Sequence, residues 1–400
     1  MHSRAFRYTM FGSLYFTQGT VLGYFTSLNA LYLLAHGVSM ESVGIMSLIA
    51  LLPFVLKIFM GLLSDKVNLF GWGHRRPYIF IGLGIQTICL IIVPFIDPGI
   101  HFPWFVFIAF MLQAGMALYD TCTDGMAIDT TPPEEEGIIQ GFMVGGRAIG
   151  TILSATLVGL LANQGDWNYV FWLLAILTLL PLPFVIRMSE AQEVADREFK
   201  WAAFAQFKHV SIILLSVIGF MAFFIIAGVN QVMNPFFTEQ LGINLRIAGN
   251  VASIWGIGVV LGGMLTGWLI KKFGYERMIF VVILFAAASI GIMSTVQSTE
   301  LMWLVAFLFG YAYGSYQTTY FALSMGNVDK NVAATMYSIF MAISNIGQGV
   351  GMAVIGGMVD NKGYVHALLV FAAINLIILP IAFLFNRMHK KKPAAQPQAA

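Results

Sequence analysis

Charged side chains are rare in this sequence of 400 residues: Asp, Glu, Lys and Arg together make up only 10%, whereas hydrophobic residues make up 58%. Soluble domains usually carry about 25% charged residues, so the composition excludes an ordinary soluble protein. Cysteine is rare too. The two cysteines, Cys89 and Cys122, fall in apolar segments, which excludes a disulfide framework and a cysteine-based zinc site.

Sequence signals of an enzyme are also missing. No glycine-rich loop ends in Gly-Lys-Ser or Gly-Lys-Thr, so ATP is not expected to be the energy source. The seven histidines are scattered without the spacing of metal ligands, and a net charge of +2 gives no reason to expect nucleic acid as a partner. We therefore expect neither an enzyme nor a bound cofactor.

Long apolar runs dominate the sequence instead. A spanning helix needs about 20 mostly apolar residues, and this rule predicts an all-α membrane protein. No cleavable signal peptide is expected, because Arg4 and Arg7 are followed by a full-length apolar run. Twelve transmembrane helices are predicted, at residues 10–34, 42–64, 77–96, 103–127, 138–162, 168–187, 209–236, 247–270, 277–295, 300–325, 332–358 and 364–386.

The basic residues predict the orientation of these spans. If the N-terminus is cytoplasmic, 17 of the 21 Lys and Arg residues lie on the cytoplasmic side and only Arg246 and Lys362 lie outside. Cytoplasmic loops are enriched in Lys and Arg, so both termini are predicted to be cytoplasmic. The two remaining basic residues, Lys57 and Arg147, fall within spans. We expect a multi-pass protein of the bacterial inner membrane, in contact with lipid and acting as a monomer.

One short loop pattern occurs twice. The sequence Gly61-Leu62-Leu63-Ser64-Asp65-Lys66, followed by His74-Arg75-Arg76, recurs in degraded form as Gly267-Trp268-Leu269-Ile270-Lys271-Lys272, followed by Gly274 and Arg277. Matching loops in two halves of an apolar chain are typical of duplicated secondary transporters. The predicted units are a six-helix half at 1–188, a cytoplasmic linker at 189–208, a second six-helix half at 209–386 and a disordered cytoplasmic tail at 387–400.

Ionisable residues inside the predicted spans are the first candidates for function. A charge at the centre of a span costs about 2.5–3.5 kcal/mol on insertion scales, so it normally faces protein or water and has a partner. Counted from the inner helix ends, Lys57, Asp120 and Arg147 lie at comparable depth. Gln113, Asp120 and Asp124 share one helix face. We interpret Asp120, and more weakly Asp124, as proton-coupling residues beside basic groups that hold an anion. The alternative is a salt bridge that only ties helices together.

The predicted spans of the second half carry neutral polar residues instead. These residues would supply hydrogen bonds to a substrate while coupling belongs to the first half, or they would only join helices to one another. The candidates are Asn230, Asn234, Gln317, Asn345 and Gln348.

Two sets of residues carry a resemblance to known transporters. Gly61 and Asp65, with the basic cluster at 74–76, resemble the signature loop of the major facilitator superfamily, and the stretch from Leu56 through Tyr78 is similar to folate–biopterin transporters. The segments Thr123–Asp129 and Gly146–Gly150 resemble the branch of AmpG muropeptide permeases and acetyl-coenzyme A transporters. The chain departs from that branch at Gly125, where a carboxylate is typical.

The resemblance implies two six-helix halves that rock around a central site, a movement usually driven by the proton gradient. We therefore expect a secondary transporter that moves a small organic solute, plausibly anionic, in symport with protons. Gly61, Asp65, Arg75 and Arg76 would form a cytoplasmic gate. The alternatives are a proton-independent facilitator or exporter, and a membrane sensor with the same fold that transports nothing.

Overall fold

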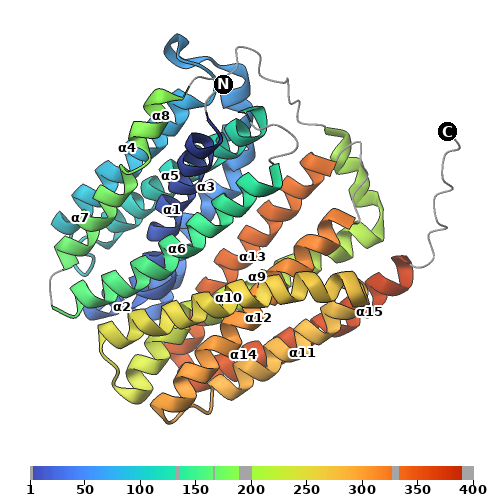
Figure 1. The fold of residues 1–400 in the computed structure, drawn as a ribbon. Helices are drawn as coiled ribbons and strands as arrows, with labels where there is room; N and C mark the ends of the chain where they lie inside the picture. Colours follow the sequence, from blue (N-terminus) through green and yellow to red (C-terminus); the bar gives the residue numbers. More distant parts are fainter. Residues whose placement is uncertain (1–2, 131–135, 165–166, 189–200, 327–332, 390–400) are drawn as a thin grey trace, which may run out of the picture.

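A computed structural model describes residues 3–130, 136–164, 167–188, 201–326 and 333–389, and every regular element within them is a helix. The helices gather in two groups (Figure 1). The N-terminal bundle, α1 to α8, lies in the upper left of the view, and most of the C-terminal bundle, α9 to α15, lies in the lower right.

Within its described residues, the N-terminal bundle contains eight α-helices and two short 3₁₀ helices. They are α1 (Arg4–Ser27), α2 (Asn29–Ala35), α3 (Met40–Lys66), η1 (Leu69–Gly71), α4 (Arg76–Ile92), η2 (Val93–Phe95), α5 (Phe102–Thr130), α6 (Glu136–Ala162), α7 (Trp167–Thr178) and α8 (Leu182–Arg187). The predicted spans 10–34 and 168–187 are each divided between two helices. The first is interrupted at Leu28, and the second is interrupted before Pro181, which precedes α8.

The C-terminal bundle begins after a 3₁₀ helix, η4 (Trp201–Lys208), at the end of the predicted linker. Residues 189–200 of that linker and 390–400 of the predicted tail lie outside the described residues. The helices of the bundle are α9 (Val210–Leu241), α10 (Leu245–Phe273), α11 (Tyr275–Met293), α12 (Thr299–Gly326), α13 (Ala333–Lys362), α14 (Tyr364–Leu376) and α15 (Ile378–His389).

Each of the twelve predicted spans coincides with one helix or with two consecutive helices. Among the described residues, ten segments are both long enough and apolar enough to cross a membrane. The helices α1 and α12, which occupy the other two predicted spans, are not among these ten. Twelve crossings and two cytoplasmic termini therefore stay predictions, while the all-helical membrane architecture is confirmed.

Glycines set the crossing of α1 with α6. A Cβ atom on Gly19 would overlap the carbonyl of Arg147, and one on Gly146 would overlap the carbonyl of Gly12. Small residues allow helix backbones to approach closely inside a membrane. The crossing places the middle of α1 directly against the turn of α6 that carries Arg147.

Gly19→Ala should therefore destabilise the protein strongly for so small a change. The added methyl group meets backbone, which cannot turn aside as a side chain can, and overpacking of this kind costs about 1–3 kcal/mol. The loss of stability is measured as a fall in the unfolding temperature of the purified protein. Gly145→Ala is the matched control, because a Cβ atom there has nothing within 4 Å. Equal unfolding temperatures for the two variants would contradict the close crossing of α1 and α6.

The two bundles contact each other at the end that is predicted to face outward. There, the carboxylate of Asp360 near the end of α13 accepts hydrogen bonds from the backbone N–H groups of Met40 (3.1 Å) and Glu41 (2.7 Å) at the start of α3. A Cβ atom on Gly356 would overlap the carbonyl of Met40, so the helices also touch through backbone. Asp360 thus caps a helix of the opposite bundle.

Asp360→Ala should loosen this contact between the bundles. Loss of a capping carboxylate costs about 1 kcal/mol, enough to raise the open population about five-fold. The measurement is the labelling rate of a cysteine at Ser47, with a membrane-impermeant thiol reagent added at the outer face; both native cysteines are buried. Asn361→Ala is the control, because its side chain bonds its own helix through the Gly357 carbonyl. Unchanged labelling would show that Asp360 does not hold this end closed.

Candidate functional site

Asp120 on α5 lies between two cations. Its Oδ2 atom is 3.5 Å from Lys57 Nζ on α3, and its Oδ1 atom is 3.8 Å from an Nη atom of Arg147 on α6. The side chain of Asp120 is only 5% exposed, whereas those of Lys57 and Arg147 are 31% and 42% exposed. The structure therefore brings together the three charges that the sequence placed at one depth, with the acid buried and both cations partly open.

Helix α1 adds two residues to this group. The side-chain amide of Gln18 donates to Asp120 Oδ1 (2.8 Å) and accepts from Arg147 Nε (2.9 Å). The hydroxyl of Tyr15 donates to the carboxylate of Asp124, and the Tyr15 ring lies 4.8 Å from the Arg147 guanidinium carbon. We call these six residues, Tyr15, Gln18, Lys57, Asp120, Asp124 and Arg147, the charge cluster.

A second polar region, the amide pocket, lies between the two bundles. The space among its lining residues, including the part that is open to solvent, is about 700 Å³. Residues of α1, α2, α3 and α5 line one side, and residues of α9, α12 and α13 line the other. None of its lining residues is ionised at neutral pH. Its polar lining residues are Thr26, Asn29, Ser47, Gln113, Asn230, Gln231, Tyr313 and Gln348.

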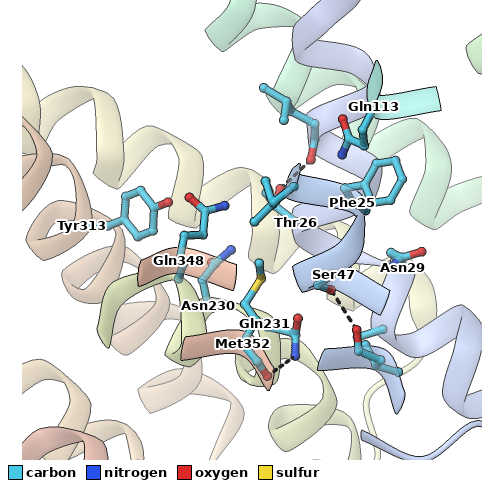
Figure 2. A pocket seen from close by; sticks show the side chains of 16 residues that line it. Phe25, Thr26, Asn29, Ser47, Gln113, Asn230, Gln231, Tyr313, Gln348 and Met352 are labelled. Carbon is cyan, nitrogen blue, oxygen red and sulfur yellow. Dashed lines mark hydrogen bonds between the residues drawn. The ribbon is translucent and has the colours of Figure 1, made fainter. Parts of the chain in front are cut away.

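The amides of this pocket have unused hydrogen-bonding capacity. In Figure 2, Gln348 and Asn230 lie on one side of the space, and Thr26 and Gln113 lie on the other. Four buried amide oxygens of the pocket, on Asn29, Gln113, Asn230 and Gln231, have no hydrogen-bond partner within the described part of the chain. Buried polar atoms are normally paired, so these groups suit a polar ligand or ordered water.

The pocket and the charge cluster belong to one region of the protein. Gln113 and Asp120 lie two turns apart on α5, a rise of about 10 Å. Of the residues predicted from the sequence, Gln113, Asn230 and Gln348 line the pocket, and Lys57, Asp120, Asp124 and Arg147 form the cluster. A solute that reached both would meet neutral amides at one end and two cations at the other.

Three predicted residues lie elsewhere. Asn234 donates to the Ala248 carbonyl (3.3 Å) and joins α9 to α10. Asn345 donates to the Phe54 carbonyl (3.4 Å) and so joins α13 to α3 across the two bundles. Gln317 is half-buried on α12 and does not line the pocket. The first two residues have visible roles in joining helices, which was the alternative interpretation of this group.

The predicted cytoplasmic gate is only partly described. Gly61 lies on α3 against Thr121, whereas the side chain of Asp65 is outside the described residues. Arg75 is buried and donates to Ser64 Oγ, and Arg76 donates to the Ile186 carbonyl (2.6 Å). These contacts lie within the N-terminal bundle, and the cytoplasmic gate formed by Asp65 with Arg75 and Arg76 stays a prediction.

The position of Arg75 also explains why this chain has Gly125 where the AmpG branch typically has a carboxylate. A Cβ atom on Gly125 would lie 2.7 Å from the guanidinium carbon of Arg75. The guanidinium thus occupies the space that a side chain at position 125 would need. In this chain a carboxylate at that position would have to displace Arg75.

Comparisons with known proteins agree with this architecture. The sequence model of the Major Facilitator Superfamily matches residues 11–352 and 215–400. The anhydromuropeptide permease of Escherichia coli strain K12 is 23% identical over 374 residues, which cover 87% of this chain and 72% of the permease. The folate-biopterin transporter of Synechocystis sp. is 26% identical over 261 residues, covering 62% of this chain and 52% of that protein.

A solved structure has the same fold. The nucleoside transporter NupG superposes with a TM-score of 0.81 over 96% of this chain and 99% of its own, at 14% sequence identity. At that identity the likeness concerns the fold alone. The two curated relatives match the two transporter groups that the sequence motifs resemble.

Proposed function

The chain belongs to the Major Facilitator Superfamily, and on that premise we propose that it moves a small anionic organic solute across the bacterial inner membrane in symport with protons. In this proposal the chain crosses the membrane twelve times with both termini in the cytoplasm, and its two bundles alternate in opening around the amide pocket. The curated relatives are transporters rather than enzymes.

The observation that carries the proposal is the geometry of Asp120. A buried carboxylate flanked by two partly exposed cations is a costly arrangement for helix packing alone. It suits coupling, because a proton on Asp120 would release Lys57 and Arg147 to hold an anion. Asp124, one turn further along α5, is a second proton-coupling candidate. The amides of Gln113, Asn230 and Gln348 would hold an uncharged part of the solute.

The relatives suggest the compounds to test. An anhydromuropeptide and folate both carry carboxylates, whereas biopterin shares the pterin ring of folate without them. The experiment measures uptake of each labelled compound into proteoliposomes that contain the purified protein, with and without an imposed proton gradient. We expect accumulation of a carboxylate-bearing compound, its collapse with an uncoupler, and weaker transport of biopterin than of folate.

Other outcomes separate the alternatives. If the labelled compound equilibrates across the membrane whether or not a proton gradient is imposed, the protein is a facilitator. If the compound moves only out of the vesicle interior against the gradient, the protein is an exporter. No flux of any compound that binds would favour a sensor. Each of these results would replace the symport proposal.

A further inference from the structure

The Gln18 side chain uses both ends of its amide within the charge cluster. Its oxygen accepts from Arg147 Nε at 2.9 Å, and its nitrogen donates to Asp120 Oδ1 at 2.8 Å. The residue is 3% exposed. Arg147 and Asp120, whose charged groups are 3.8 Å apart, are thus also linked by hydrogen bonds through this amide.

Tyr15, one turn earlier on α1, makes the equivalent link to the second acid. Its ring lies under the Arg147 guanidinium, 4.8 Å from the carbon to the ring centre, and its hydroxyl donates to the Asp124 carboxylate. Asp120 and Asp124 are one turn apart on α5. Each of the two α1 side chains therefore connects the same arginine to a different carboxylate.

The helix crossing keeps this geometry fixed on one side. Gly19 and Gly23 on α1 pack against the α6 backbone at Arg147 and Thr151, so the two helix backbones lie close together there. Thr151 Oγ1 also donates to the Gly19 carbonyl (3.1 Å). Arg147, Tyr15 and Gln18 thus sit on one tightly packed helix pair, whereas both acids sit on α5.

We propose that Tyr15 and Gln18 are positioning residues that link anion binding at Arg147 to protonation of Asp124 and Asp120. This inference rests on the proposed symport function. An ionised carboxylate only accepts hydrogen bonds, whereas a protonated one also donates. When a proton from water adds to either carboxylate, that group loses its charge, and the hydrogen bond that it accepts from α1 becomes a weaker, neutral one. The guanidinium is then held less firmly through Gln18 or Tyr15.

Two residues of α1, Gln18 and Tyr15, contact Arg147 and also hydrogen-bond to an acid of the cluster. Lys57 on α3 faces the other oxygen of Asp120, at 3.5 Å, and it does not lie between Asp120 and Arg147. The direct contact from Arg147 to Asp120, at 3.8 Å, is longer than a charge-assisted hydrogen bond of about 2.7–2.9 Å. The hydrogen-bonded path from Arg147 to Asp120 therefore runs through Gln18, beside the direct attraction of the two charges.

The test compares Tyr15→Phe and Gln18→Met with matched controls. Tyr24→Phe removes a hydroxyl from another buried tyrosine of α1, and Gln86→Met removes a buried amide that bonds Thr178 away from the cluster. The readouts are gradient-driven accumulation of folate or an anhydromuropeptide, whichever the unmodified protein accumulates, and exchange of internal for external compound without a gradient.

Tyr15→Phe keeps the ring beneath Arg147 and loses only the bond to Asp124. We expect accumulation to fall about ten-fold, within the usual range of coupling between sites, while the KM of exchange stays as it is. Gln18→Met removes the acceptor that orients the guanidinium, so it should raise KM as well.

The inference and the proposed function fail in different ways. An unmodified protein that accumulates neither compound under a proton gradient would remove the proposed function, and the inference with it. Normal accumulation by Tyr15→Phe and Gln18→Met, or equal loss of exchange and accumulation in both, would overturn the inference alone. If Tyr24→Phe and Gln86→Met lost as much accumulation as the test variants, any buried polar group would matter equally. That result would also overturn the inference.

Discussion

Asp120→Asn is expected to abolish gradient-driven accumulation while exchange of solute continues. A proton gradient worth about 100 mV, or about 2.3 kcal/mol for one proton, supports a concentration ratio of about 50-fold. The asparagine keeps an acceptor for Gln18 but cannot gain a proton or lose a charge. The ratio should therefore fall to about one, because the acid that pairs with both cations can no longer carry the proton.

The measurement is the steady-state ratio of labelled folate or anhydromuropeptide in proteoliposomes, beside exchange in the same preparation. Asp97→Asn is the matched control, since the Asp97 carboxylate bonds the backbone N–H of Gly99 within its own loop. A proportional loss of both activities would assign Asp120 to folding rather than coupling. Full accumulation by the variant would remove Asp120 from the mechanism altogether.

The sequence predicted the helices well because hydrophobic length decides them. A run of about 20 apolar residues is a strong signal, and the described residues of each predicted range form one helix or two consecutive helices. The interruptions at Leu28, before Pro181 and at Ile377 were missed, since local breaks in a spanning helix depend on what packs beside it. The predicted orientation rests on the distribution of basic residues.

The sequence predicted those residues of the candidate site that carry a charge. The cost of burying a charge made Lys57, Asp120 and Arg147 visible from sequence, and the structure brings them together. Tyr15 and Gln18 were missed because an uncharged tyrosine or glutamine is less costly to bury in a membrane span than a charged residue. Such residues are therefore a weaker sign of function in the sequence. The rule that selected Gln113 applies equally to Gln18, so a uniform search for amides in spans would have found it.

The neutral residues of the C-terminal bundle show the limit of such a search. Asn230 and Gln348 line the pocket, whereas Asn234 and Asn345 bond backbone carbonyls of neighbouring helices. All four are amides at similar positions in apolar helices. Which amide faces the pocket depends on helix rotation and crossing, and these follow from packing between segments far apart in the chain.

Arg147→Lys should damage transport even though the charge is kept. The guanidinium makes three contacts at once: Nε donates to Gln18, an Nη atom faces Asp120, and the flat face lies over Tyr15. A compact ammonium cannot reproduce this arrangement. We expect KM for the accumulated compound to rise about ten-fold, because a hydrogen bond to a charged group contributes about 1.5–3 kcal/mol. Arg187→Lys, at the end of α8, is the control.

A pair of further variants tests whether Arg147 and Asp120 depend on each other. Arg147→Ala leaves the buried Asp120 with one cation of the cluster, Lys57, and with the hydrogen bond from Gln18. Removal of one partner of a buried ion pair is strongly destabilising. Because Arg147 is 42% exposed, water replaces part of the lost interaction, so we expect reduced abundance rather than complete loss. Adding Asp120→Ala removes the stranded charge and should restore part of the abundance in the membrane. A double variant no more abundant than either single variant would show that the two residues do not act as a pair, and the charge cluster would then have to be organised around Lys57 instead.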